Sequence, residues 1–195
     1  MEDEGIIKKS FNSEWASPLV PVLKKNGDIR LCVDFRYLNS YLKRDFYQLP
    51  TIEDLLITLS GSKYFSSLDA RSGYHQIPIS EDSQHLLTFT SPFGSYKFQR
   101  LPFGIATAPE IYQKIMNEIL ADIDGVFCYL NDILIHSSDS DSHQHILERV
   151  FERLEKANIK LNKEKCFFFI KKRCRFWDYY LLILELNLTL TKSML

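Results

Sequence analysis

The chain has 195 residues, of which 45% are hydrophobic and 13% aromatic, so it suits one domain or a large part of one and is not an intrinsically disordered protein. Its 24 Lys and Arg residues against 25 Asp and Glu residues give a net charge of −1, which neither requires nor excludes a nucleic-acid partner. No apolar run approaches the roughly 18 to 20 residues of a membrane-spanning helix. We therefore expect a soluble, intracellular, cytoplasmic protein.

The cysteines and histidines do not form a recognisable metal-binding pattern. Four cysteines lie at wide and irregular spacings, and no secretory signal peptide precedes them, so we expect reduced and mostly buried thiols. Three histidines lie close together in sequence, but their Asp and Ser neighbours favour a solvated loop and the start of a helix. These residues are Cys32, Cys128, Cys166 and Cys174, and His136, His143 and His145.

The N-terminal part predicts a β-hairpin and a short helix. Prolines keep residues 17–23 extended, and a basic turn at 24–28 leads into a second strand over residues 29–35. A capping threonine, early acids and spaced leucines then predict a helix over residues 51–59, which ends before Gly61. The hairpin therefore carries a cationic tip.

The next part predicts strands. Alternation predicts a strand over residues 63–69, which places Asp69 at its carboxyl end. Two more β regions are predicted over residues 74–79 and 86–98, and a turn at 91–94 interrupts the second of them.

Two amphipathic helices follow. The first opens at Thr107 with a proline in its first turn, and its apolar residues recur on one stripe as far as Leu120. The second begins after the Asp- and Ser-rich residues 139–142 and has apolar residues at helical spacing from Ile146 to Leu154. Two such helices with several strands predict an α+β fold, with an antiparallel sheet and helices packed on one face.

Between these helices, residues 126–137 form an apolar, β-prone run that Asn131 and Asp132 interrupt. We expect this polar pair to be the turn of a hairpin, with one carboxylate raised at its tip, where a metal ion or a phosphate can reach it. Such a dipeptide is usually only a turn, so it indicates metal chemistry only together with other motifs.

Several further blocks supply those motifs, in one order and at consistent spacing. The N-terminal blocks are Gly5-Ile6-Ile7, Trp15 to Val20, Arg30 to Asn39 and Tyr47 to Asp54. The later blocks are Phe65 to Ile77, Leu101 to Pro109 and Tyr129-Leu130-Asn131-Asp132. From about Gly5 to about Arg175, the chain resembles the reverse transcriptase of the Pol polyprotein of Gypsy-type LTR retrotransposons, and the last block stands where that family has Tyr-x-Asp-Asp.

The resemblance implies a division of the chain. Residues 1–60 would be a fingers-like N-terminal part, and residues 61–175 the palm, with part of the fingers inserted. Residues 176–195 would be a degenerate primer-grip region and a divergent tail. The fold would then be the fingers and palm of a right-handed polymerase, and we expect the remaining Pol domains, such as RNase H and integrase, to be missing here.

The resemblance also implies an activity, RNA-directed DNA polymerisation by nucleotidyl transfer. Such chemistry uses two Mg²⁺ ions about 3.5 to 4 Å apart, which stabilise the attacking and leaving oxygens. Asp69 and Asp132 would be the catalytic metal ligands, and Asn131 would occupy a third, degenerate ligand position. The partners would be a primed RNA or DNA template and deoxynucleoside triphosphates, inside a virus-like particle.

Other family positions would hold the nucleotide and the primer. Three cations would grip the triphosphate, a tyrosine would lie beneath the sugar, and two further residues would line the nucleotide and template side of the pocket. In that order, these residues are Lys24, Lys25, Arg30, Tyr74, Phe103 and Gln113. The primer grip would include Trp177, Asp178 and Tyr179.

Two departures from the family pattern affect these implied roles. Asn131 replaces an Asp, which removes one negative charge from a site for two divalent cations, and we expect a loss in rate of at least about 10²- to 10³-fold. Asp178 replaces a Gly of the primer grip and would repel primer phosphates. The sequence therefore predicts a weak or inactive polymerase.

Three functions remain open at this point. The chain is a poorly active polymerase fragment, a non-catalytic relic that binds nucleic acid, or a host-recruited interaction module. Residues 160–175 contain seven Lys or Arg residues against Glu164 alone, which suits either a phosphate-binding surface or a solvated face.

Overall fold

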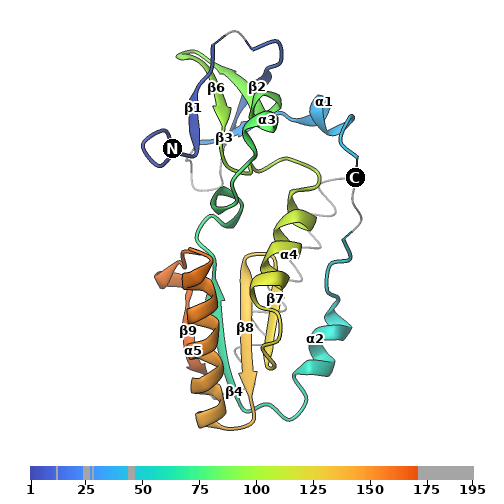
Figure 1. Ribbon diagram of the computed structural model, residues 1–195, viewed down its shortest axis with the longest axis vertical. Helices are drawn as coiled ribbons and strands as arrows, with labels where there is room; N and C mark the ends of the chain where they lie inside the picture. The colour runs from blue at the N-terminus through green and yellow to red at the C-terminus, as the bar shows by residue number, and fades with distance from the viewer. Residues whose placement is uncertain (12, 24–26, 28, 44–46, 171–195) are drawn as a thin grey trace.

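The structure of the chain, a computed structural model, describes residues 1–11, 13–23, 27, 29–43 and 47–170. Figure 1 shows an elongated molecule with a five-stranded sheet at one end and a four-stranded sheet at the other. A hydrophobic core runs through both ends without interruption, from Phe35 and Phe98 to Leu68 and Leu154. The predicted α+β fold is confirmed.

The five-stranded sheet combines N-terminal strands with strands from the middle of the chain. Its order is β1-β6-β5-β2-β3, with β1 (Ile7–Lys9), β2 (Ser17–Leu23), β3 (Ile29–Val33), β5 (Thr88–Ser91) and β6 (Gly94–Phe98). The predicted hairpin is confirmed as the antiparallel pair β2 and β3. The β region predicted over residues 86–98, with its turn at 91–94, is confirmed as the antiparallel pair β5 and β6, and β5 joins β2 in parallel.

The four-stranded sheet is antiparallel throughout and carries the Asp-containing strands. Its order is β7-β8-β4-β9, with β4 (Tyr64–Asp69), β7 (Val126–Tyr129), β8 (Asp132–Ser137) and β9 (Phe167–Ile170). The central strands β4 and β8 pair along their whole length, so their ends are held in a fixed register.

The two long helices cover one face of this sheet, as predicted. Helix α4 (Ala108–Ile119) and helix α5 (Ser140–Lys156) place their apolar stripes in the same core cluster as Leu68, Ile133 and Ile135 of the sheet. Figure 1 shows α5 in front of β4 and β9, and α4 beside β7. Each fully buried aliphatic side chain in such a cluster contributes roughly 1.5 to 3 kcal/mol.

A shorter helix, α2 (Ile52–Thr58), packs on the opposite face of the sheet. Its Leu55 joins Phe65 of β4 and Leu134 of β8 in a small separate cluster, and these strand residues alternate with those of the main core. Thr51 caps α2, because its hydroxyl accepts from the backbone N–H of Asp54 while the Asp54 carboxylate accepts from the N–H of Thr51. The predicted helix is confirmed.

Short helical turns complete the described fold. They are α1 (Arg36–Asn39), α3 (Glu81–Gln84), and the 3-10 helices η1 (Gly73–Gln76), η2 (His85–Leu87) and η3 (Lys163–Lys165). The β region predicted over residues 74–79 is wrong, because η1 replaces its first half and only a single bridge joins Pro78 to Arg100. Ser72, with φ 49°, turns the chain into η1 and ends the extended conformation.

Two of the three histidines are buried, and the expected solvated position is wrong for them. A Ser62 hydroxyl lies 2.9 Å from Nδ1 of His136, and the Ser66 hydroxyl lies 2.7 Å from Nε2 of His143. Burial lowers the pKa of both imidazoles below its usual value, and the neighbouring His143 lowers that of His136 further. His145 is exposed.

Among the cysteines of the described ranges, only Cys128 is buried. Cys32 and Cys166 are half-buried, and all three are free thiols. Burial raises the pKa of the Cys128 thiol to about 12, so it remains protonated at neutral pH. Within these ranges, no helix is long and apolar enough to cross a membrane.

Candidate metal centre

The hairpin that carries the polar pair turns one residue earlier than predicted. Tyr129 of β7 pairs with Asp132 of β8, so Leu130 and Asn131 form the two-residue turn and Asp132 is the first residue of a strand. Leu130 has φ 51° whereas Asn131 does not have a positive φ, the combination found in type II′ turns, where glycine is usual at the first position. Asp132 therefore sits on the rigid sheet and not at its flexible tip.

The two predicted carboxylate ligands lie directly opposite each other. Asp69, the last residue of β4, pairs with Asp132, the first residue of β8. Directly opposed residues of an antiparallel pair have Cβ atoms about 4.5 to 5.5 Å apart. Burial raises the pKa of the Asp132 carboxyl, and the charge of Asp69 raises it further. Two like charges meet at the end of the sheet, and the arrangement favours a bound cation.

The side-chain amide of Asn131 points into the protein. The backbone carbonyl of Asn131 accepts a 2.8 Å hydrogen bond from the N–H of Ala70, which joins the hairpin to the end of β4. Its side-chain Oδ1 is buried and has no hydrogen-bond partner among the described residues, and the same holds for the hydroxyl of Tyr112. A Cβ on Gly73 would collide with this Oδ1 and lie 2.6 Å from the Tyr112 hydroxyl oxygen, so a larger residue would force both side chains to shift.

Gln113 supports the hairpin from beneath. It lies on α4, is completely buried, and its Oε1 accepts a 2.7 Å hydrogen bond from the N–H of Leu130. Its Nε2 donates to the carbonyl oxygen of Cys128, on edge strand β7, at 2.8 Å, and to Oδ1 of Asn117 at 2.9 Å. The structure gives Gln113 a positioning contact with the metal-centre hairpin. Its predicted place on the nucleotide and template side of the pocket stays a prediction.

Two predicted nucleotide-pocket residues lie together beside the hairpin. The ring centroids of Tyr74, on η1, and Phe103 are 4.9 Å apart, and Phe103 remains 52% exposed. Tyr74 also packs edge-on against Tyr112, and burial raises the pKa of its phenol. An exposed aromatic surface therefore adjoins the carboxylate pair through Tyr112 and Gly73.

Other predicted site residues fall outside the described part of the chain. These are Lys24 and Lys25, the side chain of Arg30 on β3, and the primer-grip residues Trp177, Asp178 and Tyr179. Their proposed contacts with triphosphate and primer stay predictions.

Three residues near the centre have no assigned role in the sequence interpretation. In the sequence, Tyr112 is one residue of the apolar stripe of the first helix, and Gln76 is one residue of the motif that contains Asp69. Lys165 is one of seven cations in a basic stretch, but its Nζ lies 3.4 Å from Oδ2 of Asp69. Only this tertiary contact distinguishes Lys165 from the other cations of the stretch. For Gln76, its position in the motif around Asp69 is a signal that the sequence already contains.

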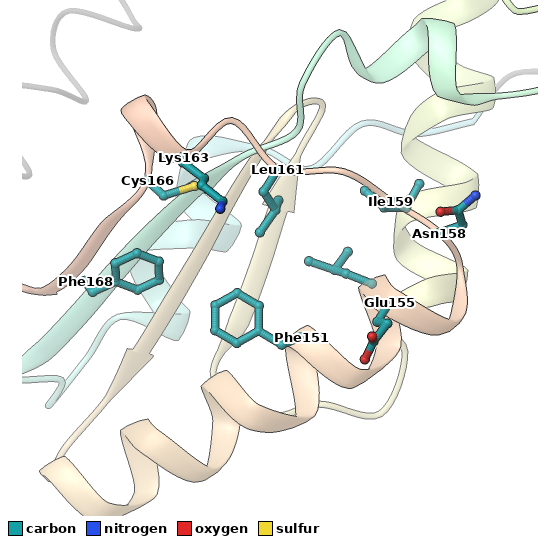
Figure 2. A pocket seen from close by; sticks show the side chains of 9 residues that line it. Phe151, Glu155, Asn158, Ile159, Leu161, Lys163, Cys166 and Phe168 are labelled. Carbon is teal, nitrogen blue, oxygen red and sulfur yellow. The ribbon is translucent and has the colours of Figure 1, made fainter. Parts of the chain in front are cut away.

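An apolar pocket of about 660 Å³ lies elsewhere, between α5 and the segment that leads to β9. Figure 2 shows Phe151 of α5 and Phe168 of β9 among its walls. The ring centroids of these two residues are 6.2 Å apart. None of the predicted site residues lines it.

Comparison with known proteins identifies the family. The profile described as "Reverse transcriptase (RNA-dependent DNA polymerase)" matches residues 22–180. The chain belongs to the reverse transcriptase family. It is 38% identical over 179 residues to the Transposon Tf2-3 polyprotein of Schizosaccharomyces pombe, a match that covers 91% of this chain and 13% of the relative. The Tf2-7 polyprotein of the same organism is 37% identical over the same length. The chain is thus a reverse transcriptase region of the Gypsy-type LTR retrotransposon class.

Solved structures show the same architecture. The foamy viral protease-reverse transcriptase in complex with double-stranded DNA has a TM-score of 0.80 and 28% identity, over 87% of this chain and 30% of that one. The same viral enzyme in complex with an RNA/DNA hybrid has a TM-score of 0.79 and 28% identity, over 86% of this chain and 22% of that one. The reverse transcriptase fingers-and-palm fold is confirmed, and the chain spans less than a third of either chain.

Members of the reverse transcriptase family use divalent metal ions, and the centre fits such an ion. Mg²⁺ is usually held by one or two carboxylates together with substrate phosphates and water. Asp69 and Asp132 supply two carboxylates side by side at the end of the sheet, and the aromatic pair of Tyr74 on η1 and Phe103 lies beside the hairpin. The described residues contain no group of three or more His, Cys, Asp or Glu side chains that could hold a metal ion.

Proposed function

We propose that this chain is the fingers and palm of an RNA-directed DNA polymerase, and that it extends a primer by nucleotidyl transfer at Asp69 and Asp132. The observation that carries the proposal is the direct pairing of these carboxylates across β4 and β8. The foamy viral relatives were solved with double-stranded DNA and with an RNA/DNA hybrid, which supports a primed template as the partner. Deoxynucleoside triphosphates and the remaining Pol domains complete the proposed system.

Each part of the site has a distinct task in this proposal. Asp69 and Asp132 hold Mg²⁺, which polarises the α-phosphate and stabilises the attacking and leaving oxygens when it is bound. Tyr74 lies beneath the incoming sugar, and Phe103 forms the adjoining wall, since their rings pack 4.9 Å apart. Lys24, Lys25 and Arg30 grip the triphosphate. Gln113 holds the hairpin, so that Asp132 keeps its register with Asp69.

We further propose that Asn131 limits the rate of this polymerase. An amide at this position leaves two carboxylates for two divalent cations, and its oxygen is buried against Gly73 and not aimed at solvent. Loss of a single electrostatic group in an active site costs about 10²- to 10³-fold in rate, and a metal ligand is worth at least as much.

Primer extension on an RNA template, with Mg²⁺ or Mn²⁺, tests both proposals. The wild-type chain is compared with Asn131→Asp, and with Asn131→Asp combined with Asp69→Asn as the inactive control. Both proposals are supported if Asn131→Asp extends the primer at least about 10²-fold faster than wild type while the double variant does not extend it. Equal extension by wild type and Asn131→Asp contradicts the limiting role of Asn131.

Failure of every variant to extend contradicts the polymerase proposal for this chain. Binding of the primed template that weakens steeply with salt would then favour a nucleic-acid-binding relic, because phosphate contacts release counterions. No binding at all would favour an interaction module.

A further inference from the structure

Lys165 stands beside the carboxylate pair of the metal centre. Its Nζ lies 3.4 Å from Oδ2 of Asp69, and its charge lowers the pKa of Asp132 against the raising effects of burial and of Asp69. The Asp69 side chain is only 16% exposed, whereas that of Lys165 is 59% exposed. The ammonium therefore approaches the pair from the solvent side, with its charge directed at two opposed carboxylates.

Backbone contacts fix the segment that carries Lys165. The N–H of Asn162 donates a 2.8 Å hydrogen bond to the carbonyl oxygen of Asp69 itself, and Leu161 forms an antiparallel bridge with Ala70. The Asn162 side chain then accepts from the N–H of Glu164 and begins the 3-10 helix η3, which ends at Lys165. The ion pair is thus a consequence of how this segment docks on the end of β4.

Gln76 holds the same segment from the other side. Its Oε1 accepts a 2.7 Å hydrogen bond from the N–H of Lys160. Its Nε2 donates to the carbonyl oxygens of Lys160, at 3.0 Å, and of Arg71, at 2.7 Å. A backbone hydrogen bond also joins the same two segments, from the N–H of Arg71 to the carbonyl oxygen of Lys160, at 2.9 Å. Gln76 therefore ties the turn that follows Asp69 to the start of the Lys165 segment.

The charges in this arrangement explain why a fixed cation is useful. Opposed like charges on neighbouring strands destabilise a sheet, and Asp69 and Asp132 form such a pair at the end of β4 and β8. A cation that remains attached through its own backbone offsets this repulsion when no metal ion is bound. When a divalent cation arrives, the same positive charge opposes it.

We propose that Lys165 is a resident counter-ion of the Asp69 and Asp132 pair, which a divalent cation must displace, and that Gln76 positions it. The part that concerns the divalent cation rests on the proposed function, whereas the effect on the metal-free protein does not. Lys165 thereby stabilises the empty centre and weakens its affinity for Mg²⁺.

Thermal unfolding of the chain over a Mg²⁺ titration at constant ionic strength tests the proposal. Lys165→Met should lower the melting temperature without metal by about 1 to 4 °C. It should also raise the Mg²⁺ affinity about two- to fivefold, the effect expected for a partly exposed ion pair. Lys163→Met is the matched control, because it removes the same charge from the same 3-10 helix and forms no ion pair within the described ranges. It should change neither quantity.

Gln76→Leu tests the positioning role. It should raise the Mg²⁺ affinity as Lys165→Met does, and the double variant should show no further increase, because both changes remove one interaction. Independent, additive effects would refute positioning by Gln76.

Each other outcome decides a separate point. An equal Mg²⁺ response in wild type and Lys165→Met, or a weaker one in the variant, overturns the competition. An unchanged melting temperature without metal overturns the counter-ion role. No Mg²⁺ response in wild type or in any variant overturns the metal site of the proposed function, and the proposed competition with it. The counter-ion role is then still tested by the melting temperatures measured without metal.

Discussion

Replacement of Gln113 by leucine should destabilise the protein, because it removes the side chain that holds the metal-centre hairpin. Leucine fills a similar volume, so packing in the core under β7 is largely kept. The N–H of Leu130 and the carbonyl oxygen of Cys128 lose their partners, and a buried polar group without a partner costs about 1 to 3 kcal/mol. Because the Leu130 turn is only half-buried, water recovers part of this loss, and we expect a total of about 2 to 4 kcal/mol.

Urea denaturation followed by circular dichroism measures this loss as a lower midpoint with an unchanged slope. Gln144→Leu is the matched control, since Gln144 is exposed on α5 and, among the described residues, its side chain donates only to Glu148, at 3.0 Å. We expect the control to remain within about 0.5 kcal/mol of wild type. A cost below about 1 kcal/mol for Gln113→Leu would refute the view that this side chain holds the hairpin.

The remaining predictions concern buried groups. The pKa values of His136 and His143 are lowered by burial, so the unfolded chain binds more protons once the pH falls below the unfolded value of about 6.5. Stability should be complete above that pH and should decrease as the pH falls towards 5; urea midpoints between pH 8 and 5 measure this, and a flat profile would contradict the burial of both rings. Tyr112→Phe removes a buried hydroxyl that has no hydrogen-bond partner in the described part of the chain, so we expect unchanged stability or a gain of up to about 1 kcal/mol. The control Tyr47→Phe should lose about 1 kcal/mol, because its hydroxyl accepts a 2.7 Å hydrogen bond from Asn117, and an equal loss in both variants would show that the Tyr112 hydroxyl is paired.

Local pattern was sufficient for the regular elements. The stripe of α4 and the alternation of β4 are periodic signals that depend only on which side of an element faces the core, and both appear within two residues of their predicted limits. The capping box at Thr51 and Asp54 is a contact between neighbours in sequence, so it too could be predicted.

Pattern failed where a distant contact outweighed a local preference. Residues 74–79 look β-prone, but Ser72, with φ 49°, turns the chain into η1, and Gly73 packs against Tyr112 and Asn131 from distant parts of the chain. Polar neighbours suggested a solvated His143, but hydroxyls of Ser66 and Ser137, on two different strands, surround its ring inside the protein. The hairpin turn lies one residue earlier than predicted, because Asp132 pairs with Asp69 and Tyr129 as the first residue of β8.

By itself, the sequence determined the family and the residues that can perform the chemistry of that family. It could do so because several motifs occur over most of the chain in one order and at consistent spacing. It also showed that an amide stands at the second hairpin position. Only the tertiary structure decided which charges meet. Asp69 and Asp132 are 63 positions apart, yet they oppose each other because β4 and β8 pair in one register. Lys165 joins them because Asn162 and Gln76 bind its segment to the end of β4. Such contacts depend on packing between remote elements, and no local propensity specifies them.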